Sequence, residues 1–187
     1  MSADDIKRSA LKCFSKFGYE GTSLSMITEE LGMKKQSIYA HYKSKEDIFI
    51  SVLNTVLQEE KEFLDEYFSK ECINSAEFLN NFIAIIKERF TSDKEYNIKF
   101  IIATSYMPPE KLTEELGDKC NTYFDEIETR VRNVISKNGK DELENERKVQ
   151  VFITIVVGLF SALAYRNIEA YEKRHEACWK LFIKDHI

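Results

Sequence analysis

Residues 18–48 read GYEGTSLSMITEELGMKKQSIYAHYKSKEDI, and they hold several signals that begin and end helices. Thr22 and Ser23 are both suitable N-caps for a short helix, because their hydroxyls can accept from free backbone amides. Gly32 stands where a left-handed residue closes that helix, and Ser44 can open a longer one. The stretch therefore predicts a short helix, a tight glycine turn and a second helix of roughly two turns.

The second short helix is expected to carry one apolar strip and one polar face. At about 100° per residue, Ile38 and Tyr42 lie nearly one above the other, so both should point inward. Gln36 and Ala40 then point outward, with Ser37 and a tyrosine on the flanks. A small face rich in hydrogen-bond donors suits the DNA major groove, which admits a helix and displays acceptors on its base edges.

Each exposed residue type has a matching partner on DNA. Glutamine can pair with adenine, lysine with guanine and serine with either base, while an alanine can touch a thymine methyl group. Tyr39, Lys43 and Lys45 are expected to reach phosphates, and the helix that begins at Lys45 adds its amides to an anion site. A solvated lysine-rich surface helix is the alternative, and the preceding helix, glycine turn and following cap favour a helix-turn-helix. The predicted DNA-binding residues are Thr22, Ser23, Lys34, Lys35, Gln36, Ser37, Tyr39, Ala40, His41, Lys43 and Lys45.

This stretch resembles the DNA-binding signature of the TetR family of bacterial transcription regulators. The matching positions, without insertion or deletion, are Gly18, Tyr19, Thr22, Ser23, Ile27, Gly32, Ser37, Ile38, Tyr39, His41, Tyr42, Lys45, Glu46, Asp47 and Ile48. The resemblance implies an all-α protein with a three-helix DNA-binding domain at residues 1–47. It also implies that residues 48–187 form a helical domain for effector binding and dimerisation.

The rest of the chain shows helical periodicity without strand-like alternation. A first helix, capped by Ser2 and Asp5, ends at Gly18. Pro108–Pro109 and Asn138–Gly139 are the clearest breaks further on. With the two short helices, about nine helices are expected, and the later ones span about 44–68, 75–91, 94–107, 109–137, 143–167 and 169–185.

The charges of the chain are unevenly distributed. The 187 residues carry a net charge of -5, with 43% hydrophobic and 32% charged residues, so a packed core is expected. Residues 1–50 hold eight basic and seven acidic side chains, whereas the remainder holds nineteen basic and twenty-five acidic ones. The acidity therefore belongs to the C-terminal part, which can face away from a polyanion.

Several other classes of protein find little support in the sequence. The four cysteines lie far apart without a C-x-x-C pair, so neither a metal site nor a disulfide framework is expected, and no cofactor is indicated. No phosphate loop or nucleophile motif indicates an enzyme. The N-terminus lacks a signal peptide, and the apolar run Val151–Tyr165 has 15 residues, fewer than the about 20 of a membrane span. A cytoplasmic protein without a membrane partner is expected.

The aromatic content favours an effector cavity in the C-terminal part. The chain has 13 Phe and 9 Tyr, and large rings that pack irregularly can leave an apolar cleft with a few polar groups. A small apolar effector, neutral or weakly polar, is expected, while a solid core remains the alternative. The predicted lining residues are Phe82, Ile86, Phe100, Thr104, Met107 and Tyr123.

The last two helices are expected to form a two-fold dimer. The helix at 143–167 is apolar nearly all round, and Gly158 and Ala162 would allow a close helix approach. An intramolecular bundle is the alternative, and the TetR resemblance favours the homodimer. The predicted interface residues are Ile155, Gly158, Leu159, Ala162, Tyr171, His175, Cys178, Trp179 and Phe182.

These features together predict a dimeric transcriptional regulator, expected to be a repressor that a small apolar effector releases from a pseudo-palindromic double-stranded DNA operator. The alternative is a helical module for small-molecule binding or protein interaction whose DNA-binding head is inactive.

Overall fold

The computed structural model describes residues 2–92, 94–137 and 141–186, and this part of the chain is helical without a strand. The elements are α1 (Ala3–Gly21), α2 (Leu24–Glu30), η1 (Lys35–Ala40), α3 (Lys45–Phe68), α4 (Ser75–Phe90), α5 (Glu95–Tyr106), η2 (Glu110–Leu112), α6 (Thr113–Ser136), α7 (Glu142–Tyr165) and α8 (Ile168–His186). The predicted all-α class is confirmed. The expected break at Asn138–Gly139 lies outside the described residues.

The start and the interruption of α1 follow the sequence signals. Ser2 N donates to Asp5 Oδ2 at 2.8 Å, and Asp5 N donates to Ser2 Oγ at 3.3 Å, which completes a capping box. Gly18 adopts φ 69° and ψ 177°, a conformation that residues with a Cβ rarely reach. The helical backbone is interrupted there, and a short second piece of α1 carries the chain on to Gly21.

The helix-turn-helix forms as predicted, with one difference in its second helix. Ser23 caps α2 by accepting from Met26 N at 3.2 Å, and Gly32 has φ 62°, which makes the turn. The second helix, η1, is a six-residue 3-10 helix rather than an α-helix. Lys34 offers it no side-chain cap, and the bond from Ser37 N to Lys34 O at 2.9 Å closes a tighter turn.

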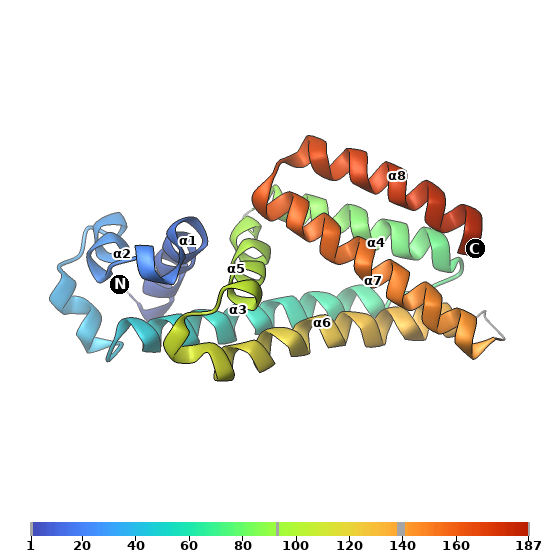
Figure 1. The fold of residues 1–187 in the computed structure, drawn as a ribbon. Coiled ribbons are helices and arrows are strands. Elements are labelled where there is room, and N and C mark those ends of the chain that lie inside the picture. Colours follow the sequence, from blue (N-terminus) through green and yellow to red (C-terminus); the bar gives the residue numbers. More distant parts are fainter. Residues whose placement is uncertain (1, 93, 138–140, 187) are drawn as a thin grey trace.

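The longest helix of the N-terminal half begins at the predicted cap. Asp47 N donates to Ser44 Oγ at 3.1 Å, while the Asp47 carboxylate accepts from Lys43 N at 2.9 Å instead of from Ser44 N. From there α3 continues to Phe68 and links the two parts of the molecule (Figure 1). We call α1, α2, η1 and the first turns of α3 the head, and the remaining helices the bundle.

The molecule is elongated, with the head at one end and the C-terminus at the other (Figure 1). In the bundle, α3 and α6 lie side by side, α4 and α7 lie over them, and α8 packs on α4 and α7 (Figure 1). The short helix α5 stands between the head and the bundle, where it packs against α1, α3, α6 and α7. Helix α5 is therefore the element through which the bundle touches the head most directly.

An aromatic cluster joins the head to α5. The ring centroid of Phe49 lies 4.9 Å from that of Phe14 and 5.0 Å from that of Phe100. Close aromatic pairs of this kind add stability beyond their buried area. Ser15 Oγ of α1 also donates to the backbone oxygen of Tyr96 at 3.2 Å. The head is thus fixed to α5 by both apolar and polar contacts.

Candidate functional site

The apolar side of η1 is held firmly against the rest of the head. Ile38 is fully buried and Tyr42 is 7% exposed, as the sequence pattern predicted. The Tyr42 hydroxyl donates to Ala3 O at 3.3 Å and lies 3.5 Å from Ser51 Oγ. These contacts attach η1 to both α1 and α3, so its outer face is presented in one orientation.

The outer face of η1 and the residues beside it are open to solvent. Tyr39 is 56% exposed although it is a large aromatic residue. Lysines, a glutamine and a serine surround it, which gives a surface of hydrogen-bond donors over a rigid support. The exposed residues among those predicted to bind DNA are Ser23, Lys34, Lys35, Gln36, Ser37, Tyr39, Ala40, His41 and Lys43.

Lys45, which was predicted to reach a phosphate, points into the protein instead. Its ammonium donates to Tyr19 O at 2.8 Å and to Thr22 O at 3.0 Å, and lies 4.1 Å from the centroid of the Tyr19 ring. The carbonyls at a helix C-terminus carry partial negative charge, so a cation is favoured there. Lys45 therefore closes the end of α1.

Thr22 is also turned inward. It is 2% exposed, and its hydroxyl donates to Gly18 O at 2.7 Å across the glycine break. Of the two hydroxyl residues that could have capped α2, the structure uses Ser23. Thr22 therefore stabilises the end of α1, and its side chain does not belong to the exposed surface.

The six residues predicted to line an effector cavity lie in different environments. Met107 is 82% exposed at the end of α5, whereas Phe82, Ile86 and Thr104 are buried in the core. Phe100 faces the head, as its contact with Phe49 shows. The structure therefore does not gather the six around one cavity, because a helical stripe cannot distinguish cavity lining from close packing.

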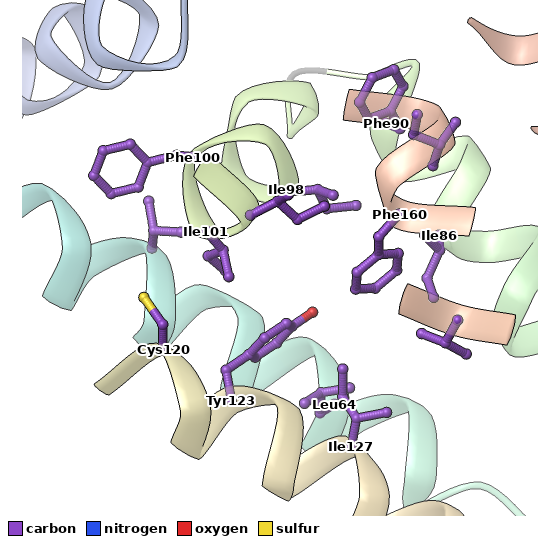
Figure 2. Packing of buried hydrophobic residues seen from close by; sticks show 14 of the residues in the cluster. Leu64, Ile86, Phe90, Ile98, Phe100, Ile101, Cys120, Tyr123, Ile127 and Phe160 are labelled. Atoms are coloured by element: carbon purple, nitrogen blue, oxygen red, sulfur yellow. The ribbon is translucent and has the colours of Figure 1, made fainter. Parts of the chain in front are cut away.

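Tyr123 is the member of that set that borders an open groove. The groove runs between α3 and α6 and has a volume of about 270 Å³. In Figure 2 the Tyr123 ring rises from its helix between Cys120 and Ile127 and directs its hydroxyl into the interior. The lining residues are Asn54, Leu57, Gln58, Lys61, Lys119, Thr122, Tyr123 and Glu126.

A buried polar cluster, which the sequence reading missed, lies beneath this groove. Glu60 is 1% exposed and pairs with the guanidinium of Arg89, while Asn97 Nδ2 donates to Glu60 Oε1 at 3.0 Å. The Tyr123 hydroxyl donates to Glu60 Oε2 at 3.5 Å, and burial raises the pKa of that hydroxyl well above its ordinary value. The sequence does contain a signal that Glu60 is buried, because Glu60 follows the buried Val56 at the four-residue spacing of an apolar helix stripe.

The residues predicted for the dimer interface divide into two groups. Leu159, Ala162, Tyr171 and Phe182 are buried inside the subunit, and the Tyr171 hydroxyl donates to Ile83 O at 2.7 Å. Their side chains are therefore already used by the fold of one chain. The half-buried members are Ile155, Gly158, His175, Cys178 and Trp179.

An uncovered face of α7 and α8 runs beside the half-buried group. A Cβ added at Gly158 would meet nothing within 4 Å, so this glycine faces open space. The guanidinium of Arg174 donates to Gly158 O at 3.4 Å, which brings the two helices together at this point. The exposed residues of this face are Val151, Thr154, Tyr165, Arg174, Ala177 and Leu181.

One helix among the described residues, α7, is long and apolar enough to cross a membrane by length and composition. The helix has 24 residues, whereas the apolar run Val151–Tyr165, which is too short for a membrane span, has 15. Core helices of helical bundles meet the same criteria. Within the described part of the chain, no group of three or more His, Cys, Asp or Glu side chains could hold a metal ion.

Residues 6–52 match the family described as bacterial regulatory proteins, tetR family. The biofilm operon icaADBC HTH-type negative transcriptional regulator IcaR of Staphylococcus epidermidis is 29% identical over 138 residues, which cover 72% of this chain and 67% of that protein. The uncharacterized HTH-type transcriptional regulator YezE of Bacillus subtilis is 41% identical over 49 residues, which cover 26% of this chain and 25% of that protein.

Solved structures share the fold over nearly the whole chain. A TetR-family transcriptional regulator from Agrobacterium tumefaciens has a TM-score of 0.73 at 19% identity, with 96% of each chain covered. The transcriptional regulator FadR from Bacillus subtilis, solved in complex with stearoyl-CoA, has a TM-score of 0.70 at 17% identity, with 100% of each chain covered. The likeness in fold thus extends well beyond the head.

Proposed function

We propose that this chain, whose residues 6–52 match the tetR family, is a transcriptional regulator that acts as a dimeric, effector-controlled repressor. Each subunit would place η1 in one major groove of a pseudo-palindromic operator. The protein would act in the bacterial cytoplasm, without a membrane partner.

The division of η1 into a buried and an exposed side is the observation that carries this proposal. Ile38 and Tyr42 hold the helix down, while Lys35, Gln36 and Ser37 stand free. A rigid support keeps the reading side chains in place, which reduces the entropy lost when they bind DNA. If η1 were only a solvated surface helix, it would not need the buried Tyr42 and its two polar contacts to hold it in one orientation.

We assign the exposed residues to two kinds of DNA contact. Lys35, Gln36 and Ser37 would read base edges, and Ala40 would touch a thymine methyl group. Phosphate contacts position the head without reading sequence. The residues assigned to phosphates are Ser23, Lys34, Tyr39, His41 and Lys43.

Thr22 and Lys45 have a supporting role in this proposal. Both are engaged with backbone carbonyls at the end of α1, so they would position the head rather than contact DNA. This assignment replaces the direct contacts expected from the sequence.

We propose the uncovered face of α7 and α8 as the homodimer interface. Gly158 allows a partner helix to approach closely, and Ile155, Cys178 and Trp179 on the same two helices are only half-buried in one subunit. A two-fold axis through this face would make it a self-complementary surface. The two heads would then lie one or more helical turns of DNA apart, about 34–36 Å for a single turn.

Release by an effector is the regulatory part of the proposal. IcaR, which is similar in sequence, is named a negative regulator, and FadR, which shares the fold, was solved in complex with stearoyl-CoA. An effector with higher affinity for a form whose heads are wrongly spaced would weaken operator binding by linkage.

Selection of bound sequences from a random double-stranded DNA pool tests the proposal. We expect enrichment of a pseudo-palindrome with two half-sites, and loss of preference at one position per half-site when the selection is repeated with Gln36→Ala. A pool that stays random with the wild-type protein would overturn the proposal. It would leave the alternative of a binding module with an inactive head.

A further inference from the structure

Helices α1, α3 and α5 pack against one another in pairs, so they form a closed triangle between the head and the bundle. On the α1–α3 side of this triangle, Lys7 Nζ donates to Thr55 Oγ1 at 3.1 Å. On the α1–α5 side, Ser15 Oγ donates to the backbone oxygen of Tyr96 at 3.2 Å. Because α1 belongs to the head, the head cannot turn about α3 unless one side of the triangle opens.

Asn97 makes the polar contact on the third side, between α5 and α3. Its side chain is 2% exposed, and its Nδ2 donates to Glu59 Oε2 and to Glu60 Oε1, both at 3.0 Å. A primary amide carries two N–H groups on one nitrogen atom, so it can bridge two neighbouring carboxylates. Asn97 therefore uses both donors of its amide to hold consecutive residues of α3.

The two carboxylates are balanced by cations from α4 and from the start of α5. Lys94 Nζ lies 2.8 Å from Glu59 Oε2, and the guanidinium of Arg89 on α4 pairs with Glu60. Lys94 is the N-cap residue of α5 and does not cap that helix with its side chain. The start of α5 is therefore held by α3, and the bonds that Asn97 adds are of the stronger kind, since their acceptors are charged.

The contacts that α5 makes with the head lie close to Asn97. The backbone oxygen that accepts from Ser15 belongs to the residue directly before Asn97. One turn further along α5, the ring centroid of Phe100 lies 5.0 Å from that of Phe49 and 6.3 Å from that of Phe14. A shift of this part of α5 away from α3 would therefore loosen the support of α1.

We propose that Asn97 is a positioning residue for DNA binding, which ties α5 to α3, fixes the head relative to the bundle and thereby sets the separation of the two half-sites that the dimer recognises. Asn97 is buried, so it would act through α5 and α1 and not by contact with DNA. The separation of the half-sites rests on the proposed function, whereas the fixing of the head does not.

Small-angle X-ray scattering of the full-length protein without DNA tests whether Asn97 fixes the head. Asn97→Leu keeps a side chain of similar size and removes both donors, so its distance distribution should broaden as the head takes up a range of positions. Asn97→Ala is the second variant, in which water can reach the carboxylates and replace the lost bonds during folding. Tyr67→Phe is the matched control, because it removes a buried hydrogen bond of 2.6 Å to Phe78 O near the other end of α3, and its distribution should stay unchanged.

Operator binding tests whether Asn97 sets the separation of the half-sites. Selection from a random DNA pool should yield one spacer length with the wild type and several with the Asn97 variants. The variants should bind the wild-type operator about tenfold more weakly and a duplex with a single half-site within about twofold of the wild type, because bivalent binding depends on how the second head is placed. A head that was only destabilised would lose affinity for the single half-site as well and would keep the spacer length.

The possible outcomes separate the two parts of the proposal. An unchanged scattering profile in the folded Asn97 variants, or equal broadening in Tyr67→Phe, overturns the fixing of the head by Asn97. A broadened profile with an unchanged spacer length overturns its role in the separation of the half-sites. If the wild-type protein selects no DNA, the proposed function is overturned, and the scattering profiles still decide whether Asn97 fixes the head.

Discussion

The Lys45 ammonium lies 4.1 Å from the centroid of the Tyr19 ring, between two backbone carbonyls that it bonds at 2.8 and 3.0 Å. Burial, with help from Glu46, raises the pKa of the Tyr19 hydroxyl, so the ring stays neutral beside the cation. The pair connects the start of α3 to the end of α1. Lys45 thus orients the long helix relative to the rest of the head.

Lys45→Met should destabilise the head without changing the electrostatics of DNA binding. The methionine retains the stem but loses two hydrogen bonds of a charged group, so unfolding free energy should fall by about 1.5–3 kcal/mol. The slope of log affinity against log salt should stay unchanged, since the ammonium is already bonded to the carbonyls of Tyr19 and Thr22. Urea unfolding and fluorescence anisotropy in a salt series measure the two effects. Lys43→Ala is the matched control, with unchanged stability and a slope reduced by about one charge per subunit.

Gln36→Ala should reduce specificity rather than overall attraction to DNA. Loss of a paired base contact should weaken operator binding by about 1–3 kcal/mol, while affinity for random DNA stays nearly constant. Competition binding against random DNA measures the ratio. Gln150→Ala on α7, far from the head, is the control and should leave the ratio unchanged. An unchanged ratio in Gln36→Ala would mean that η1 does not read the bases.

The parts of the fold that local signals specify could be predicted from the sequence. Ser2, Ser23 and Ser44 begin helices where their hydroxyls predicted, and Gly18 and Gly32 adopt positive φ at the expected breaks. Caps and glycine conformations depend on a few neighbouring residues, so one chain is enough to read them. The 3-10 geometry of η1 could not be predicted, because it depends on the capping and backbone hydrogen bonds at the ends of the segment.

The candidate sites depended on tertiary contacts, and the sequence predicted them less well. Lys45 looked like a phosphate ligand, because nothing local shows that the carbonyls of Tyr19 and Thr22 would meet it. The predicted effector residues lie on helical stripes, which give the same pattern for Met107 at the surface and Phe82 in the core. Periodicity predicts which face of each helix points inward, but it does not predict which residues or cavity that face contacts.

Gly158→Glu should yield folded monomers. A side chain at Gly158 meets nothing within 4 Å in one subunit, so the fold of the monomer is spared, whereas the charge would lie in the proposed interface. Light scattering with size-exclusion chromatography measures the mass. Gly158→Ala is the control, which should keep the dimer and gain about 0.4–1 kcal/mol in stability from reduced freedom of the unfolded chain. If Gly158→Glu still had the mass of a dimer and the dimer were as stable as that of the wild type, the interface would lie elsewhere.

His175 should make the bundle less stable in mild acid. Burial, with a contribution from Lys87, lowers the pKa of its imidazole below the ordinary 6.5, and its Nε2 lies 2.8 Å from Asn80 Oδ1. The unfolded chain therefore binds a proton more readily, and stability is lost as the pH falls from 6.5 towards the lower folded-state pKa. Melting temperatures at pH 7.5 and 5.5 should differ less in His175→Gln than in the wild type. An equal difference in both proteins would assign the acid sensitivity to other groups.

Arg89→Met should be the most destabilising of these changes, because it leaves the buried carboxylate of Glu60 without its cation. Breaking a buried pair from one side typically costs about 3–5 kcal/mol. In Glu60→Gln/Arg89→Met the uncharged amide can accept from Asn97 through its oxygen and donate to the Tyr123 hydroxyl oxygen through its NH2 group, so most of that loss should be recovered. Urea unfolding of the four proteins in the double-mutant cycle measures the coupling. The same cycle on the exposed pair Lys173–Glu169 is the control and should show little coupling. If the double variant were no more stable than Arg89→Met, the stranded carboxylate would not be the cause, and lost packing of the guanidinium on Phe63 would account for the effect.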